Sequence, residues 1–169
     1  MTVAADSPAE TDGNTLYLDL RSGRVTIEML PDLAPRHVER IKELVREGFY
    51  DGLKFHRVIE GFMAQTGDPR GDGSGGSGQR LRAEFNEESH RRGIVSMART
   101  PNPDGADSQF FILLADRPDL DRQYTVWGRV IDGMEHVDEI KLGDPYRDGL
   151  VRNPDIIIRM RMAADIEGD

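Results

Sequence analysis

Short segments of alternating apolar and polar residues, separated by turn residues, constrain the fold of this chain most. The segments 14–20 and 24–30 (NTLYLDL and RVTIEML) alternate with a period of two, and Ser22-Gly23 lies between them. This pattern is typical of half-buried strands joined by a hairpin. Similar strand candidates cover 94–98, 108–114, 124–131 and 154–162. In the last of these, alternation places one set of side chains on a common face: Ile156, Ile158, Met160 and Met162.

Two segments change to helical spacing. In the first, Pro35 suits the opening turn, Gly48 suits the C-terminal cap, and four apolar residues share one face: Val38, Ile41, Leu44 and Val45. The second covers residues 133–144. About eight strands, two helices and no βαβ rhythm favour a mainly β fold. We therefore predict a closed eight-stranded antiparallel barrel capped by two α-helices.

Length and charge indicate one soluble domain with acidic ends. A chain of 169 residues suits a single domain with a full hydrophobic core. The net charge of -9 includes acidic residues at both ends and no lysine or arginine in 1–14 or 163–169. We predict a flexible N-terminal tail over 1–13, a domain over 14–162 and an acidic C-terminal tail over 163–169. Because an acidic protein is repelled by phosphate backbones, nucleic acid is not an expected partner.

Several other function classes are disfavoured. The chain has no cysteine, which excludes disulfides and thiol nucleophiles, and its four histidines lack a zinc-motif spacing, so no metal site is predicted. The segment GDGSGG (71–76) matches a dinucleotide fingerprint formally but lacks the strand before it and the helix after it. The first residues do not resemble a secretory signal and no run is long enough to span a membrane. We expect a cytoplasmic protein with no membrane partner.

The stretch FHRVIEGFMAQTGD, residues 55–68, places polar side chains inside an apolar hairpin. Its two short strands meet at Glu60-Gly61, and residues two apart along a strand share a face. Arg57 and Gln65 can therefore converge on one side of the sheet. From this pattern alone, the arginine is explained equally well by a position at the barrel rim beside a carboxylate.

Four blocks in their order along the chain resemble the signature segments of cyclophilins, the peptidyl-prolyl cis-trans isomerases: FHRVIEGFMAQTGD, GIVSMA, DSQFFILL and LDRQYTVWGRVI. The resemblance covers residues 14–162. It implies an eight-stranded barrel with two helices, a substrate groove on the outside of the barrel and no cofactor. It also implies catalysis of cis-trans isomerisation at X-Pro bonds in peptides and in unfolded or partly folded proteins.

The resemblance assigns catalysis to Arg57. An X-Pro amide loses its resonance at the twisted transition state, so its nitrogen lone pair becomes a hydrogen-bond acceptor. A fixed donor aimed there stabilises the twisted state over both planar states. Arginine suits this role because it is always charged and never accepts a hydrogen bond.

The resemblance also implies the substrate-binding residues. Phe62, Met63, Phe111 and Leu120 are expected to line the proline pocket, and Gln65 to hold a substrate carbonyl and orient Arg57. Ala98 and Arg99 are expected to offer backbone groups to the residues before proline, and Gln109 to lie along the groove. Tyr124 stands where many relatives carry histidine, and Arg99 replaces a common asparagine.

One departure from the family concerns its inhibitor. Asp119 stands where many cyclophilins have a tryptophan whose indole N–H helps to bind cyclosporin, so weak cyclosporin binding is expected. Oligomerisation is not indicated, and a monomer is expected. The alternative functions are a non-catalytic proline-peptide binding or chaperone module, and a barrel that holds a small ligand in its lumen. The intact Arg57, Phe62, Gln65 and Phe111 favour the enzyme.

Overall fold

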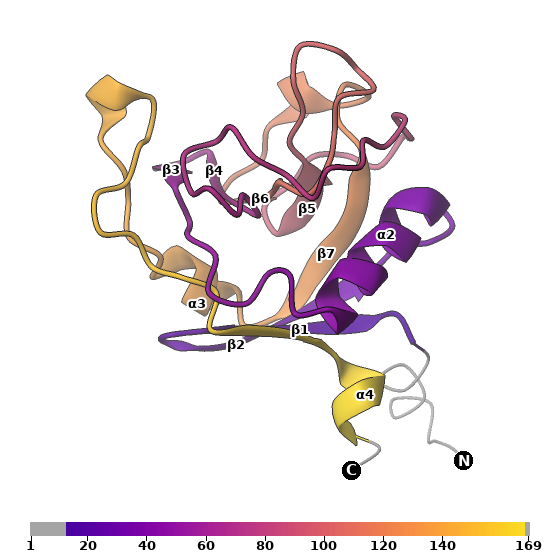
Figure 1. The fold of residues 1–169 in the computed structure, drawn as a ribbon. Coiled ribbons are helices and arrows are strands. Elements are labelled where there is room, and N and C mark those ends of the chain that lie inside the picture. Colours follow the sequence, from indigo (N-terminus) through magenta and orange to yellow (C-terminus); the bar gives the residue numbers. More distant parts are fainter. Residues whose placement is uncertain (1–12, 168–169) are drawn as a thin grey trace.

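The computed structural model describes residues 13–167, and the predicted N-terminal tail lies almost wholly outside this part (Figure 1). Eight strands form one sheet in the order β3-β4-β6-β5-β7-β2-β1-β8, with antiparallel pairing throughout. The strands are β1 (Thr15–Leu20), β2 (Gly23–Met29), β3 (Arg57–Ile59), β4 (Met63–Thr66), β5 (Ile94–Met97), β6 (Phe110–Leu113), β7 (Val126–Asp132) and β8 (Arg159–Met162).

Of the two predicted helices, the first is confirmed and the second is shorter than predicted. The longest is α2 (Pro35–Arg46), whose buried face includes the predicted apolar residues and which packs against β8. The predicted second helix over 133–144 is reduced to α3 (Met134–Asp138), because the chain beyond it turns so that Gly143 N–H bonds to Val58. Two 3-10 turns, η1 (Pro118–Leu120) and η2 (Pro145–Arg147), lie in loops. No helix among residues 13–167 has the length and apolarity needed to cross a membrane.

The predicted closed barrel is wrong, because the sheet is an open, curled half-barrel. Its end strands β3 and β8 share no ladder. The isolated bridges Lys54↔Ile156 and Arg57↔Leu150, together with further backbone hydrogen bonds, link β3 and the segment before it to the loop that precedes β8. The chain between α3 and β8 contains η2 and left-handed residues at Asp148 and Asn153. Such a backbone cannot continue a strand ladder, so the sheet stays open at this point and loop segments lie between its two end strands.

Segment 163–169, predicted as an acidic tail, begins with the short helix α4 (Ala163–Glu167). Ala163 is buried, and Asp165 of α4 pairs with Arg46 of α2, with Arg46 Nε 3.1 Å from Asp165 Oδ2. The start of this segment therefore packs against the domain.

Two apolar clusters occupy the two faces of the central strands. Alternate residues of β4 and β6 divide between them: Ala64, Phe110 and Ile112 join the large core inside the curl, whereas Met63, Phe111 and Leu113 join a smaller cluster on the outer face. Because both faces are covered, these strands read as continuous apolar runs. The outer cluster forms the floor of the site described next.

Candidate functional site

Three neighbouring strands place Arg57, Gln65 and Phe111 in one row on the outer face. Arg57 of β3 is paired directly with Gln65 of β4, and Gln65 is paired with Phe111 of β6. Directly opposed residues of antiparallel strands share a face, so the register sets the spacing of the three side chains. The convergence predicted from the alternation in 55–68 is therefore confirmed.

The Arg57 guanidinium is held by three hydrogen bonds. Nη1 donates to Gln65 Oε1 (3.1 Å), Nε donates to the Asp148 carbonyl (3.0 Å) and Nη2 donates to Asp148 Oδ1 (3.0 Å). The side chain keeps 31% of its surface exposed. Since a guanidinium has five N–H donors, one donor on Nη1 and one on Nη2 remain for a molecule bound at the surface.

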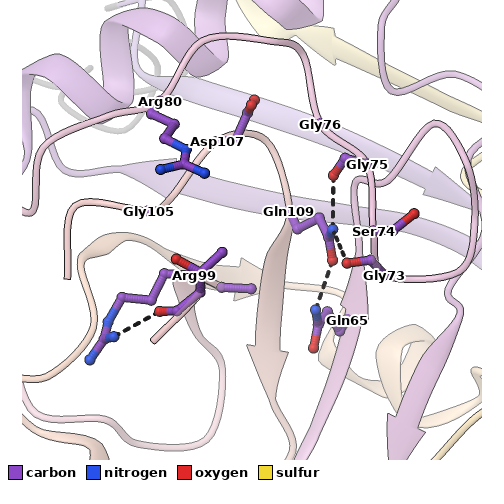
Figure 2. A pocket seen from close by; sticks show the side chains of 12 residues that line it. Gln65, Gly73, Ser74, Gly75, Gly76, Arg80, Arg99, Gly105, Asp107 and Gln109 are labelled. Atoms are coloured by element: carbon purple, nitrogen blue, oxygen red, sulfur yellow. Dashed lines mark hydrogen bonds between the residues drawn. The ribbon is translucent and has the colours of Figure 1, made fainter. Parts of the chain in front are cut away.

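A relay of amides continues from Arg57 toward the glycine-rich segment, residues 67–79 (GDPRGDGSGGSGQ). Gln65 Nε2 donates to Gln109 Oε1 (2.9 Å), and Gln109 Nε2 donates to the carbonyls of Gly73 (3.0 Å) and Gly75 (2.9 Å). Figure 2 shows Gln109 between Gln65 and this segment. The relay fixes which end of each amide presents an oxygen, so the polar side of the site is pre-oriented.

A hollow of about 110 Å³ lies beside this row. It is lined by nine of the ten predicted site residues: Arg57, Phe62, Met63, Gln65, Ala98, Arg99, Phe111, Leu120 and Tyr124. Met63 and Phe111 are buried and form an apolar floor. The Tyr124 ring meets the Phe111 ring edge to face, with centroids 5.7 Å apart. The hollow therefore combines apolar walls with the guanidinium and an amide on one side, as small-ligand sites do.

Two arginines stack on the walls of this hollow. Arg117 lies over the Phe62 ring at 4.0 Å and is paired with Asp119, while Arg99 lies over the Tyr124 ring at 4.9 Å. Arg99 also donates to the carbonyls of Gln123 and Thr100. Such cation–π contacts hold exposed aromatic rings in place. Arg117 was not among the residues predicted from the sequence, because it lies outside the four blocks that resemble cyclophilins.

The tenth predicted residue, Gln109, borders a second hollow of about 290 Å³ that shares Gln65, Ala98 and Arg99 with the first. Its other walls were missed from the sequence: Gly73, Ser74, Gly75, Gly76, Arg80, Thr100, Gly105 and Asp107. Arg80 and Arg99 reach it from different segments (Figure 2). The Ala98 N–H donates to the Gln109 carbonyl (3.0 Å), so this one of the backbone groups predicted to contact substrate is already engaged within the protein.

The glycine-rich segment is shaped by Asp68 and by close backbone approaches. Burial alone would raise the pKa of Asp68, but N–H donors from Arg70, Gly75, Gly73 and Asp72 lower it overall. A Cβ at Gly75 would lie 2.3 Å from the Asp68 carboxylate. The segment therefore forms a fixed wall of the second hollow.

A Ser–His–Asp alignment lies behind Tyr124. His90 Nδ1 is 3.2 Å from Asp121 Oδ1 and His90 Nε2 is 3.1 Å from Ser96 Oγ. Ser96 and His90 are buried, and the Ser96 hydroxyl donates to the Thr125 carbonyl (3.0 Å). Burial lowers the pKa of His90, against the opposing effect of Asp121. A hydroxyl closed off in this way cannot reach a substrate, so the group supports the Tyr124 wall.

His56 precedes Arg57 directly in the sequence, where a structural role and a substrate-contact role are equally well supported by the sequence alone. It is buried, and it does not line the hollow beside Arg57. Burial lowers its pKa, and the carboxylate of Asp68 opposes that shift. A structural role fits this position better.

Comparison with known proteins places these residues in a wider group. Residues 15–162 match the family model described as cyclophilin type peptidyl-prolyl cis-trans isomerase/CLD. A Brucella suis protein named probable peptidyl-prolyl cis-trans isomerase is 52% identical over 164 residues, which covers 90% of this chain and 84% of that protein. A Helicobacter pylori protein named peptidyl-prolyl cis-trans isomerase is 42% identical over 136 residues, covering 77% and 83%.

Solved structures agree with the sequence relatives. A Cryptosporidium parvum cyclophilin, crystallised in the presence of the dipeptide Ala-Pro, is 29% identical with a TM-score of 0.80, covering 88% of this chain and 98% of that one. A cyclophilin from Hirschia baltica is 28% identical with a TM-score of 0.81, covering 98% and 82%. The outer-face row of Arg57, Gln65 and Phe111 thus lies in a fold shared with these proteins.

Proposed function

The chain belongs to the family of cyclophilin-type peptidyl-prolyl cis-trans isomerases, and from that premise we propose that Arg57 catalyses the rotation by stabilising the twisted X-Pro amide. The single observation that supports this role most strongly is the guanidinium, which is held at three points beside an apolar hollow and keeps two N–H donors unused. Its substrates are proline-containing peptides and partly folded chains. The Cryptosporidium relative crystallised with Ala-Pro supports this substrate class.

The proline ring occupies the hollow of about 110 Å³. Met63, Phe111 and Phe62 exclude water from the ring, and Leu120 and Tyr124 close the other sides. In this position the proline nitrogen lies beside Arg57. The ring is held while the preceding residue rotates, so the apolar walls supply binding and the guanidinium supplies the selective stabilisation.

Gln65 has a separate task in this scheme. Its oxygen is engaged by Arg57 and one of its amide hydrogens by Gln109, which leaves the second amide hydrogen for a substrate carbonyl. That contact fixes the peptide on one side of the rotating bond. Orientation of this kind lowers the entropy to be lost on reaching the transition state.

The test is cis-to-trans relaxation of a short Ala-Pro peptide with wild type, Arg57→Ala and Arg57→Lys. We expect a large acceleration by wild type and a loss of about 100-fold in kcat/KM for Arg57→Ala, which corresponds to roughly 2.7 kcal/mol of transition-state stabilisation. Arg57→Lys should keep only part of the wild-type activity, because an ammonium group lacks the planar arrangement of N–H donors that a guanidinium has. Unchanged activity in Arg57→Ala would remove the arginine from the mechanism. A folded wild type without activity would favour the non-catalytic binding module.

A further inference from the structure

The loop between α3 and β8 lies against β3, the strand that carries Arg57. It appears in orange to yellow beside β3 (Figure 1). Val58 N–H donates to the Gly149 carbonyl (2.9 Å), and Gly143 N–H donates to the Val58 carbonyl (2.9 Å). A Cβ at Gly149 would lie 2.5 Å from Ile59 Cγ1, and this glycine has a φ of +80°. The loop is therefore seated at a fixed distance from β3.

Asp144 organises this loop internally. Its carboxylate accepts from Tyr146 N–H (2.9 Å), and its carbonyl accepts from the N–H groups of Arg147 (3.0 Å) and Gly149 (2.9 Å). The turn places Asp148 in the left-handed region, with a φ of 57°. Aspartate tolerates this conformation better than most residues do. Both the carbonyl and the carboxylate of Asp148 reach the Arg57 guanidinium.

We propose that Asp148 is a positioning residue that fixes the plane of the Arg57 guanidinium during catalysis. Gln65 holds Nη1 and the Asp148 backbone carbonyl holds Nε, so the Asp148 carboxylate is the group that holds Nη2. The two contacts from Asp148 are on Nε and Nη2, so together the three bonds fix the planar group at every nitrogen. The two N–H donors that remain are then held in one direction, which a preorganised donor requires.

Orientation, rather than charge, explains the effect of this carboxylate. The Asp148 side chain is 80% exposed, so solvent and salt screen its charge. The electrostatic attraction between the Asp148 carboxylate and Arg57 is therefore small, whereas the direction of the hydrogen bond does not depend on this screening. Asparagine keeps an acceptor oxygen and tolerates the same backbone conformation, so it should replace aspartate here.

The inference rests on the proposed catalytic role of Arg57, and the test separates the two. Peptide relaxation is measured at several substrate concentrations for Asp148→Ala, Asp148→Gly and Asp148→Asn. We expect kcat to fall about 3- to 10-fold in the first two with KM within roughly twofold, and the third to stay within about twofold of wild type. Asp148→Gly removes the carboxylate at a residue with no left-handed strain, which separates its loss from a backbone effect.

Asp165→Ala is the matched control, because it removes a carboxylate from an ion pair with Arg46 far along the chain and changes net charge equally. It should leave both constants unchanged. In an Arg57→Ala background, Asp148→Gly should cause no further loss, since a positioning residue acts only through the group it positions. A loss that persists there would show a structural role and overturn the inference.

The NMR signals of the Arg57 Nη groups supply a readout independent of turnover. The Asp148 carboxylate accepts from Nη2, whereas Nε–H donates to the backbone carbonyl that every variant keeps. Asp148→Gly should accelerate rotation about Nε–Cζ and exchange of the Nη2 hydrogens with solvent, and Asp148→Asn should not. Wild-type kcat in Asp148→Gly together with unchanged Nη signals would overturn the inference while leaving the role of Arg57 intact. An inactive wild type would instead refute the proposed function, and the Nη signals would still decide whether the Asp148 carboxylate holds the guanidinium.

Discussion

Arg57 and Gln65 face each other from directly paired positions of β3 and β4, with Nη1 3.1 Å from Oε1. The amide is nearly buried, and its nitrogen is engaged by Gln109. Gln65 therefore connects the guanidinium to the amide relay along the groove. Its removal should disturb both the orientation of Arg57 and the contact with substrate.

Gln65→Ala is expected to lower kcat/KM by about 10- to 100-fold, because it removes one anchor of the guanidinium and one amide donor. Gln65→Glu should fall between wild type and alanine, since it keeps an acceptor for Arg57 but loses the donor to Gln109. Peptide relaxation measures both. The exposed Gln79 offers a control, and Gln79→Ala should match wild type. Wild-type activity in Gln65→Ala would contradict the role assigned to the relay.

Gly67 is expected to be the most sensitive glycine of the segment that borders the second hollow. It has a φ of +95°, and a Cβ there would lie 2.5 Å from the Ser108 carbonyl and 2.9 Å from Gln109 Cα. Gly67→Ala should lower the free energy of unfolding by at least about 2–3 kcal/mol. The alanine would be strained by the left-handed backbone conformation, and the backbone atoms of Ser108 and Gln109 would also have to move. Urea unfolding measures this loss.

Gly78 supplies the matched control for that experiment. Its φ is +94°, and a Cβ there would meet nothing within 4 Å. Gly78→Ala should therefore cost only about 1 kcal/mol, the strain of the backbone alone. Equal losses in the two variants would mean that the approach of Gly67 to Ser108 does not limit substitution.

The sequence predicted the row of Arg57 and Gln65 because a period of two determines which side chains share a face. The same rule places Gln109, which directly precedes β6, on the side of Phe111. It failed at Ile156 and Ile158, which are exposed, while Ile157 is buried. That segment is not a strand: β8 begins at Arg159, and Ile157 instead exchanges backbone hydrogen bonds with Gly52 and Leu53.

Other features depend on contacts between distant segments, which local patterns do not encode. The sheet stays open because of loop conformations at Asp148 and Asn153, which are left-handed although neither residue is a glycine. Asp148 reaches Arg57 across 91 positions of the chain. Arg117 stacks on Phe62 from another loop. The period-of-two rule that predicted the row of Arg57 and Gln65 therefore could not predict where these side chains lie in the folded protein.

Cyclosporin binding should be weak, with a dissociation constant above about 1 μM. Asp119 accepts hydrogen bonds from Arg117 Nε (3.0 Å) and Nη2 (2.9 Å), so this position presents a carboxylate where an indole N–H would be a donor. Asp119→Trp should tighten binding at least about tenfold, and Asp119→Phe, which adds a ring without a donor, should tighten it less. Titration calorimetry measures all three proteins. Submicromolar binding by wild type would contradict this expectation.

Three buried histidines make stability depend on pH in the mildly acidic range. Burial is the main influence on His37, His56 and His90 and lowers the pKa of each, in spite of the opposing carboxylates Glu84, Asp68 and Asp121. In the unfolded chain, histidine takes up a proton near pH 6.5. Below that pH the unfolded chain binds more protons than the folded one, so the free energy of unfolding falls as the pH falls.

We expect the contribution of the histidines to the free energy of unfolding, measured by urea titration, to be constant between about pH 7.5 and 8.5. Below about pH 6.5 the free energy of unfolding should decline, by at most roughly 1.4 kcal/mol per pH unit for each histidine. The variant His56→Leu removes one of the three groups without adding charge. Its curve should run parallel to wild type above neutrality and decline less steeply between about pH 6.5 and 5.5, where one fewer proton is taken up on unfolding. Identical slopes in the two proteins over that acidic range would show that His56 is not buried in its neutral form.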